Sequence, residues 1–199
     1  MNKKEILTLH TYFPTIIGMA TNPDHKIVEN KLTKKCLKIR KKVKSGGEEW
    51  LADDTYNTLL TYDLCKDPDF SEINKFVINQ VIQYCKAQSI DLNCLDTNPV
   101  DSWLNIYKKN NFQEWHLHTN VMISAAYYLR CNNSSAKIYF KSPVLDMMSP
   151  NTLSNNDLNF EHVWFKPKPG TVLIFRSYLS HCVAHQKNND TRISLSYNF

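Results

Sequence analysis

FQEWHLHTNVMISAAYYL, residues 112–129, is the stretch that decides how this 199-residue chain folds. His116 and His118 stand two residues apart in a strand-like run, and after a short polar break a second apolar run follows. Successive side chains of a strand point to opposite faces, so residues two apart share a face. The pattern predicts two β-strands, the first of which presents a pair of imidazoles on one side of a sheet.

Short strand-like runs continue on both sides of this stretch, and clusters of Asn, Ser, Pro and Gly separate them. Many short strands with turn residues between them indicate a β-sandwich or barrel. The predicted strands span 102–107, 112–118, 122–129, 136–140, 162–167, 171–175, 181–185 and 192–199.

The first hundred residues have a different texture. Residues 5–19 resemble an opening strand, and a helix-start signal at Asn22-Pro23-Asp24 precedes apolar residues that recur every three or four positions up to Val43. A second helix with one apolar face is predicted over 70–84. We therefore expect an α+β fold in one domain, 1–199, with a strand and supporting helices in 1–100 packed outside a β-rich core in 101–199.

Composition narrows the function. Apolar residues make up 42% and charged residues 22%, which is typical of a globular protein. Neither GxxxxGK[ST] nor GxGxxG occurs, which argues against nucleotide binding. No signal peptide or apolar run of about 20 residues is found, and none of the cysteines forms a CxxC pair, so we expect a cytoplasmic protein with reduced thiols and no membrane association.

Basic residues crowd the segment 31–44. The simpler interpretation is a solvated helix face, and the alternative is a patch for nucleic acid or another polyanion. Oligomeric state is not encoded in any pattern we recognise, and a homodimer stays open.

The paired histidines suit a metal ion, because two imidazoles on one strand face can share one cation and a third from another strand would leave further positions open for substrate. His181 and His185 are both candidates for that third ligand. Downstream, Arg192 lies in the last predicted strand, and Ser194 points the same way. A buried arginine needs an anionic partner, and its planar guanidinium suits a carboxylate. A small dicarboxylate that bridges the metal and Arg192 would satisfy both sites.

The order of these motifs resembles the Fe(II)/2-oxoglutarate oxygenases, and more closely a bacterial and phage branch of them. Each motif alone is weak, whereas the whole set in this order is specific. The motifs are W-x-N-x-Y from Trp103, Q-x-x-H-x-H from Gln113, S-x-x-Y-Y-L from Ser124, P-G-x-x-x-x-F from Pro169, S-x-x-x-H-x-V from Ser177 and R-x-S-x-S-x-N from Arg192.

The resemblance implies a double-stranded β-helix (jelly-roll) core, Fe(II) as metal, 2-oxoglutarate as co-substrate and hydroxylation as the reaction. It places His116 as the first metal ligand, His181 as the last and Arg192 on the far carboxylate of 2-oxoglutarate. Tyr128 is similar to a tyrosine that binds the same carboxylate. Tyr107 and Gln113 are expected at the mouth of the same barrel, and the loop 143–161 is a candidate lid.

One position departs from the family. The commonest motif is H-x-D or H-x-E, whereas this chain has His118 at the carboxylate position, with Asn120 as an alternative ligand two residues on. Three alternatives therefore stay open: a three-histidine metal dioxygenase that does not use 2-oxoglutarate, a non-catalytic jelly-roll binding module, and a nucleic-acid repair oxygenase that uses segment 31–44. The substrate itself, whether peptidyl, nucleic acid or small metabolite, is not predicted.

Overall fold

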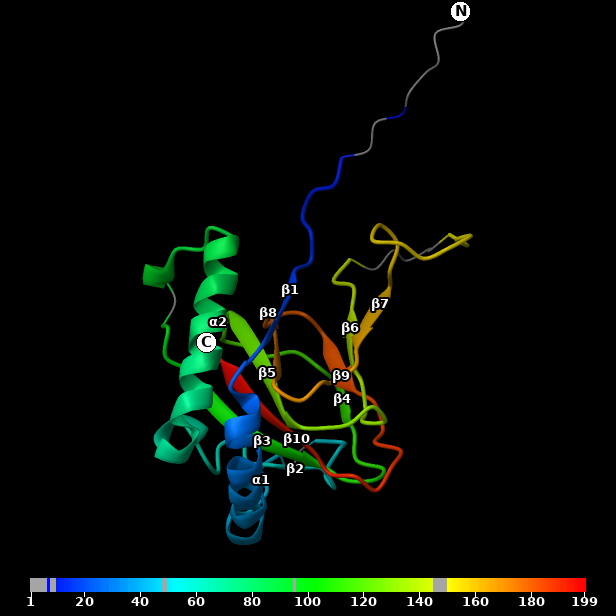
Figure 1. The fold of residues 1–199 in the computed structure, drawn as a ribbon. Helices are drawn as coiled ribbons and strands as arrows, with labels where there is room; N and C mark the ends of the chain where they lie inside the picture. Colours follow the sequence, from blue (N-terminus) through cyan, green and yellow to red (C-terminus); the bar gives the residue numbers. More distant parts are fainter. Residues whose placement is uncertain (1–6, 8–9, 48–49, 95, 145–149) are drawn as a thin grey trace, which may run out of the picture.

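Two antiparallel sheets face each other in the computed structural model, which describes residues 7, 10–47, 50–94, 96–144 and 150–199. The larger sheet has six strands in the order β1-β8-β5-β10-β3-β2, and the smaller has four in the order β4-β9-β6-β7. Neighbouring strands in both sheets are often far apart in sequence, as a jelly roll requires (Figure 1). The predicted double-stranded β-helix core is confirmed.

The strands of the larger sheet are β1 (Ile17–Thr21), β2 (Tyr56–Asn57), β3 (Asp101–Tyr107), β5 (Ile123–Arg130), β8 (Thr171–Arg176) and β10 (Arg192–Asn198). Those of the smaller sheet are β4 (Gln113–His116), β6 (Ile138–Lys141), β7 (His162–Phe165) and β9 (His181–Val183). The helices are α1 (His25–Lys42) and α2 (Ser71–Ala87), and three short 3-10 turns are η1 (Leu64–Lys66), η2 (Pro68–Phe70) and η3 (Leu92–Cys94).

Both long helices cover the outer face of the larger sheet, where α1 and α2 contact β5 (Figure 1). Their apolar stripes and one side of the sheet form the main core, to which Ile73, Val77 and Tyr127 contribute fully buried side chains. A second cluster fills the space between the sheets and includes Phe140 and Phe175. The helices thus leave the inner face of the larger sheet to the smaller sheet. Neither helix in the described part of the chain is both long and apolar enough to cross a lipid bilayer.

Alternation along β10 explains how one strand serves both sides. Ile193, Leu195 and Tyr197 belong to the main core under the helices. Because side chains alternate along a strand, the intervening residues face the other way, into the space between the sheets. Those residues are polar: Arg192, Ser194, Ser196 and Asn198. The R-x-S-x-S-x-N motif is therefore the polar face of a strand whose other face is wholly apolar.

Most strand boundaries shift by one or two residues from the sequence prediction, and two of the differences concern the opening strand and the strand that holds the histidine pair. The opening strand, predicted over 5–19, is β1 at Ile17–Thr21, and residues 5, 6, 8 and 9 of the prediction lie outside the described part. The strand predicted over 112–118 ends at His116, because the β4–β9 pairing is irregular after Gln113 and the backbone then turns so that the His118 N–H donates to the Ser177 carbonyl at 3.0 Å.

The basic segment 31–44 lies almost wholly on α1. Two of its lysines form ion pairs with the η2 region: Lys31 with Asp69 at 2.8 Å, and Lys35 with Asp67 at 2.7 Å. This part of the segment therefore holds the helix to the loop beside it. Binding of nucleic acid by the rest stays a prediction.

Candidate metal and co-substrate site

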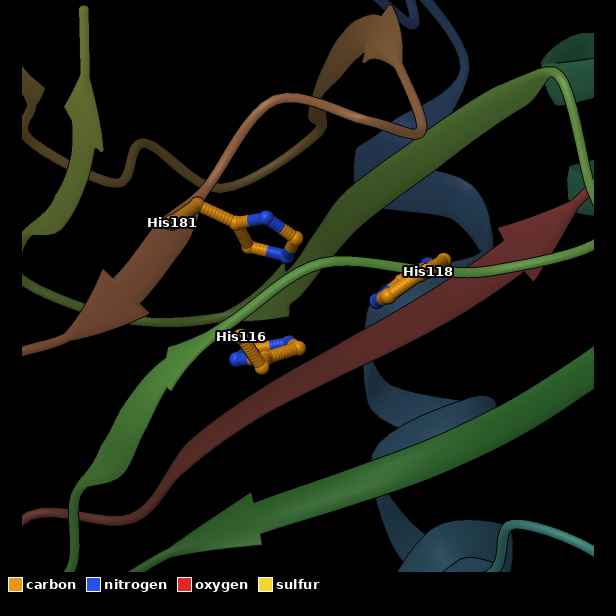
Figure 2. Close-up of side chains that lie close together, drawn as sticks. All are labelled: His116, His118 and His181. Atoms are coloured by element: carbon orange, nitrogen blue, oxygen red, sulfur yellow. The ribbon is translucent and has the colours of Figure 1, made fainter. Parts of the chain in front are cut away.

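Three histidines meet between the two sheets. His116 is directly opposite His181 in the β4–β9 pairing, and His118 follows on the loop after β4. One ring nitrogen from each lies within 4.8 Å of the others, and the ring centroids are 4.2 to 5.3 Å apart. Figure 2 shows the three rings turned toward one another. The three predicted ligands are thus brought together, although His118 arrives from a loop and not from strand alternation.

In His116 and His181, the hydrogen bond made by Nδ1 leaves Nε2 free to bind a metal ion. His116 Nδ1 is 2.8 Å from the Glu114 carbonyl oxygen, and His181 Nδ1 is 2.9 Å from the Leu179 carbonyl oxygen. A carbonyl oxygen can only accept, so each Nδ1 carries the proton and donates it. The Nε2 lone pair of each ring then remains free, which is the tautomer that a metal ion requires.

Burial keeps all three imidazoles neutral. It lowers the pKa of His116 below its usual value, although the hydrogen bond to Glu114 opposes this. Burial, and then repulsion from His116, lowers the pKa of His118 to about 4. The pKa of His181, which is 5% exposed, is well below its usual range for the same reasons. Neutral imidazoles at pH 7 suit a cation.

Arg192 lies beside this group on the inner face of β10. Its side chain is 2% exposed, and its guanidinium carbon is 4.4 Å from the Tyr107 ring centre and 5.2 Å from that of Tyr128. Its hydrogen bond to Ser194 Oγ is long, at 3.4 Å. No acidic side chain in the described ranges forms an ion pair with it, and its Nε has no hydrogen-bond partner. A buried guanidinium in this state needs an anion.

The Tyr128 hydroxyl is also a buried donor without a normal hydrogen bond in the described part of the chain. The side chain is 1% exposed, and among the described residues the hydroxyl forms no hydrogen bond of normal geometry, although it lies near the Arg192 guanidinium. Burial raises its pKa to about 12, so the hydroxyl stays protonated and can donate. Ser194 is directly opposite Tyr128 across the β10–β5 pairing, and Arg192 is opposite Tyr107 across β10–β3. Within the described chain, Arg192 Nε and the Tyr128 hydroxyl are two buried groups without a normal hydrogen bond, and the guanidinium carries further N–H donors, so together they fit a carboxylate group that binds the arginine through two hydrogen bonds.

A cavity of about 440 Å³ joins these groups. It is lined by all three histidines, Arg192, Ser194, Tyr107 and Gln113, whereas the Tyr128 ring lies against the Arg192 guanidinium and is not part of the lining. Of the alternative ligands, His185 stacks on Phe112 with ring centroids 4.4 Å apart and does not belong to the histidine group, and ligation by Asn120 stays a prediction. The candidate lid 143–161 falls partly outside the described residues, at 145–149.

Sequence reasoning missed the residues that form hydrogen bonds with His118. Ser124, Ser177 and Asn198 were each part of a recognised motif, but no role was assigned to them. All three are buried, with exposed fractions of 1%, 0% and 6%. A polar residue in an otherwise apolar strand is a signal that could have marked Ser124 as a buried polar group in need of a partner, but it does not say which residue that partner is. Trp50, whose ring stacks on His116 with centroids 6.4 Å apart, gave no signal.

Comparison with known proteins decides the family. Residues 101–198, which hold the three histidines and Arg192, match the family profile described as "Putative 2OG-Fe(II) oxygenase". Residues 101–198 belong to the 2-oxoglutarate–Fe(II) oxygenases. Fe(II) and 2-oxoglutarate are the cofactor and co-substrate that this family implies, and the donors described above fit both. No curated protein sequence matches the chain.

Solved structures agree on the fold of this oxygenase. A Pseudomonas putida prolyl-4-hydroxylase is 14% identical, with 93% of this chain and 92% of that one covered and a TM-score of 0.65. A viral collagen prolyl hydroxylase from Paramecium bursaria Chlorella virus-1, solved with 2-oxoglutarate, is 15% identical over 92% and 94%, with a TM-score of 0.55. The carbocyclase SnoK from nogalamycin biosynthesis is 7% identical over 92% and 79%, with a TM-score of 0.63. At these identities the likeness concerns the fold alone.

Proposed function

We propose that this oxygenase hydroxylates its substrate and couples that reaction to the oxidative decarboxylation of 2-oxoglutarate, with His116, His118 and His181 as the metal ligands. One observation carries the proposal: Arg192 is buried without an acidic partner in the described chain, beside a tyrosine hydroxyl that also lacks one, in the cavity wall next to three convergent imidazoles. A metal chelate at one end and a salt bridge at the other is the arrangement that a bound 2-oxoglutarate needs.

The bound Fe(II) and 2-oxoglutarate supply the oxidation: substrate C–H, O2 and 2-oxoglutarate become substrate C–OH, succinate and CO2. The chain's own residues bind and orient. Arg192, with the Tyr128 hydroxyl beside it, would hold the far carboxylate of the co-substrate, and the three imidazoles would hold the metal. Aromatic walls close this region, since Trp103 lies 5.7 Å from His118 and Phe175 lies 4.8 Å from His181, measured between ring centroids. Such walls exclude water from the reacting centre.

Several of the similar structures, among them the two described above, are prolyl hydroxylases, and this supports hydroxylation over other outcomes of this chemistry. The substrate is not assigned by this likeness, because the carbocyclase SnoK has the same fold. The rim of the cavity is apolar and accessible: Leu60, Trp115 and Leu117 line it and are 91%, 45% and 49% exposed. These exposed side chains are available for contact with a substrate.

The test is anaerobic addition of 2-oxoglutarate to the Fe(II)-loaded protein, followed by the weak visible charge-transfer band of the chelate. We expect a band in the wild type, no metal binding in His181→Ala, and metal binding without a band in Arg192→Ala. Iron bound without any band in the wild type would instead support a three-histidine dioxygenase that does not use 2-oxoglutarate. If the wild type bound no metal, the enzyme proposal would be wrong and a jelly-roll binding module would be the better description.

A further inference from the structure

His118 differs from the other two histidines in what holds it. His116 and His181 each donate to a backbone carbonyl, whereas His118 Nδ1 lies 2.6 Å from Asn198 Oδ1 and 2.9 Å from Ser124 Oγ. Because the chain has left the strand by this point, no pairing with β9 fixes the ring. The orientation of His118 therefore depends on side chains that come from the larger sheet.

Those side chains form a closed set, which we call the His118 clamp: Ser124, Ser177 and Asn198. Ser124 Oγ donates to Asn198 Oδ1 at 3.0 Å and lies 2.8 Å from Ser177 Oγ. Ser124 and Asn198 are directly opposite each other across β5 and β10. Ser177 also accepts the His118 backbone N–H through its carbonyl oxygen. The clamp thus grips both the ring and the main chain of His118.

The polarity of the clamp decides the tautomer. Asn198 Oδ1 faces both His118 Nδ1 and Ser124 Oγ, so the amide presents its oxygen, and not its nitrogen, to the ring. An oxygen acceptor next to Nδ1 requires that Nδ1 carry the proton, which leaves the Nε2 lone pair for the metal. The opposite amide orientation would leave the proton on Nε2 and prevent ligation.

We propose that Asn198, supported by Ser124 and Ser177, is the positioning residue that lets an imidazole serve as metal ligand at the place where the family's commonest motif has a carboxylate. The inference rests on the proposed metal site. A carboxylate offers a lone pair toward the metal whichever oxygen faces it, whereas an imidazole does so in only one of its two neutral tautomers. His118 therefore needs a tautomer-fixing partner that an Asp at this position would not need.

The first measurement uses the metal-free wild type and needs no variant. Nitrogen-15 NMR of labelled histidine at pH 7.5 reports which ring nitrogen of His118 carries the proton. We expect a protonated Nδ1 and an unprotonated Nε2. A protonated Nε2 would overturn the proposal.

The second measurement is Co(II) affinity, followed by its visible absorption, for the full-length variants. Loss of a partner that orients a metal-binding histidine weakens metal binding by roughly 10- to 100-fold, and we expect this for Asn198→Ala. Asn198→Asp keeps the acceptor oxygen, so its hydrogen bond with His118 Nδ1 is preserved. Its Co(II) affinity should therefore stay within roughly a factor of three of the wild type. The matched control is Asn105→Ala, which removes a buried asparagine of the same cavity whose amide donates to Ser196 and forms no hydrogen bond with a histidine in the described part of the chain.

Equal Co(II) affinity in Asn198→Ala and the wild type would refute the role of Asn198, as would a loss in Asn105→Ala as large as that in Asn198→Ala. Failure of the proposed function looks different: the wild type would then bind no Co(II). The tautomer measurement, made without metal, would still decide whether the clamp orients His118.

Discussion

Arg192→Met should separate stability from co-substrate binding, with opposite signs. The native arginine is buried with no acidic partner in the described chain, which costs several kcal/mol, while stacking on Tyr107 and Tyr128 returns about 2 kcal/mol. Methionine fills a similar volume without the charge. The ligand-free variant should therefore be as stable as the wild type, or up to about 2 kcal/mol more stable.

Binding should change the other way. Each hydrogen bond from a charged donor to a carboxylate contributes about 1.5–3 kcal/mol, so the loss of two weakens 2-oxoglutarate binding by roughly 100-fold or more. At a concentration of 100 times its Kd, 2-oxoglutarate stabilises the wild type by about 2.7 kcal/mol, which for a chain of this length raises Tm by about 5–10 °C. The variant should show almost none of this shift.

The assay is thermal melting of the Co(II)-loaded proteins with and without 2-oxoglutarate. Arg130→Met is the matched control, because Arg130 is an exposed arginine at the end of the neighbouring strand β5. It should keep the full shift. A wild-type-sized shift in Arg192→Met would refute the carboxylate role, and a ligand-free Tm many degrees below the wild type would refute the argument about an unpaired charge.

Three further outcomes are expected. Tyr128→Phe removes one neutral donor, so calorimetry should find 2-oxoglutarate binding about 3- to 10-fold weaker with metal affinity unchanged. Gly170→Ala forces a Cβ onto a backbone with φ +80° and within 2.7 Å of the His25 side chain, so urea denaturation should show a loss of about 2–4 kcal/mol; a change below 0.5 kcal/mol would contradict this. Hydrogen bonds from Lys31 and then Lys35 lower the pKa of Asp69 to about 2, below its usual value near 3.8. A lowered carboxyl pKa stabilises the fold above the unfolded pKa and loses that effect as the pH falls from about 4 to 2, so the urea midpoint should fall less steeply over that range in Asp69→Asn.

The strands were predictable because turn residues and alternation mark them locally. Along β10 the alternation of Ile193, Leu195 and Tyr197 with polar residues is legible in the sequence, and the structure puts the two sets on opposite faces. The end of β4 was not predictable, because it depends on a backbone contact with Ser177, more than fifty residues away. β1 was placed too early, since nothing local identifies which part of an extended segment pairs with β8.

The part of the site that was predictable consists of side chains whose chemistry alone points to a ligand. The three histidines and Arg192 could be selected because their side chains are costly to bury without a ligand or partner. The His118 clamp could not be selected, because Ser124 and Asn198 become partners only through the order β5-β10 within the sheet. Serine and asparagine are also common in turns, so their type alone carries little information.

The two halves of the site belong to different sheets, and these sheets should differ in how readily they unfold locally. Arg192 and Tyr128 lie on β10 and β5, central strands of the larger sheet that the helices cover, whereas His116 and His181 lie on β4 and β9 of the smaller sheet. Local opening is least costly where cover is thinnest. In amide hydrogen exchange, β5 and β10 should therefore be protected almost to the limit of global unfolding, while β4 and β9 exchange sooner. Metal binding should slow exchange chiefly in β4 and β9.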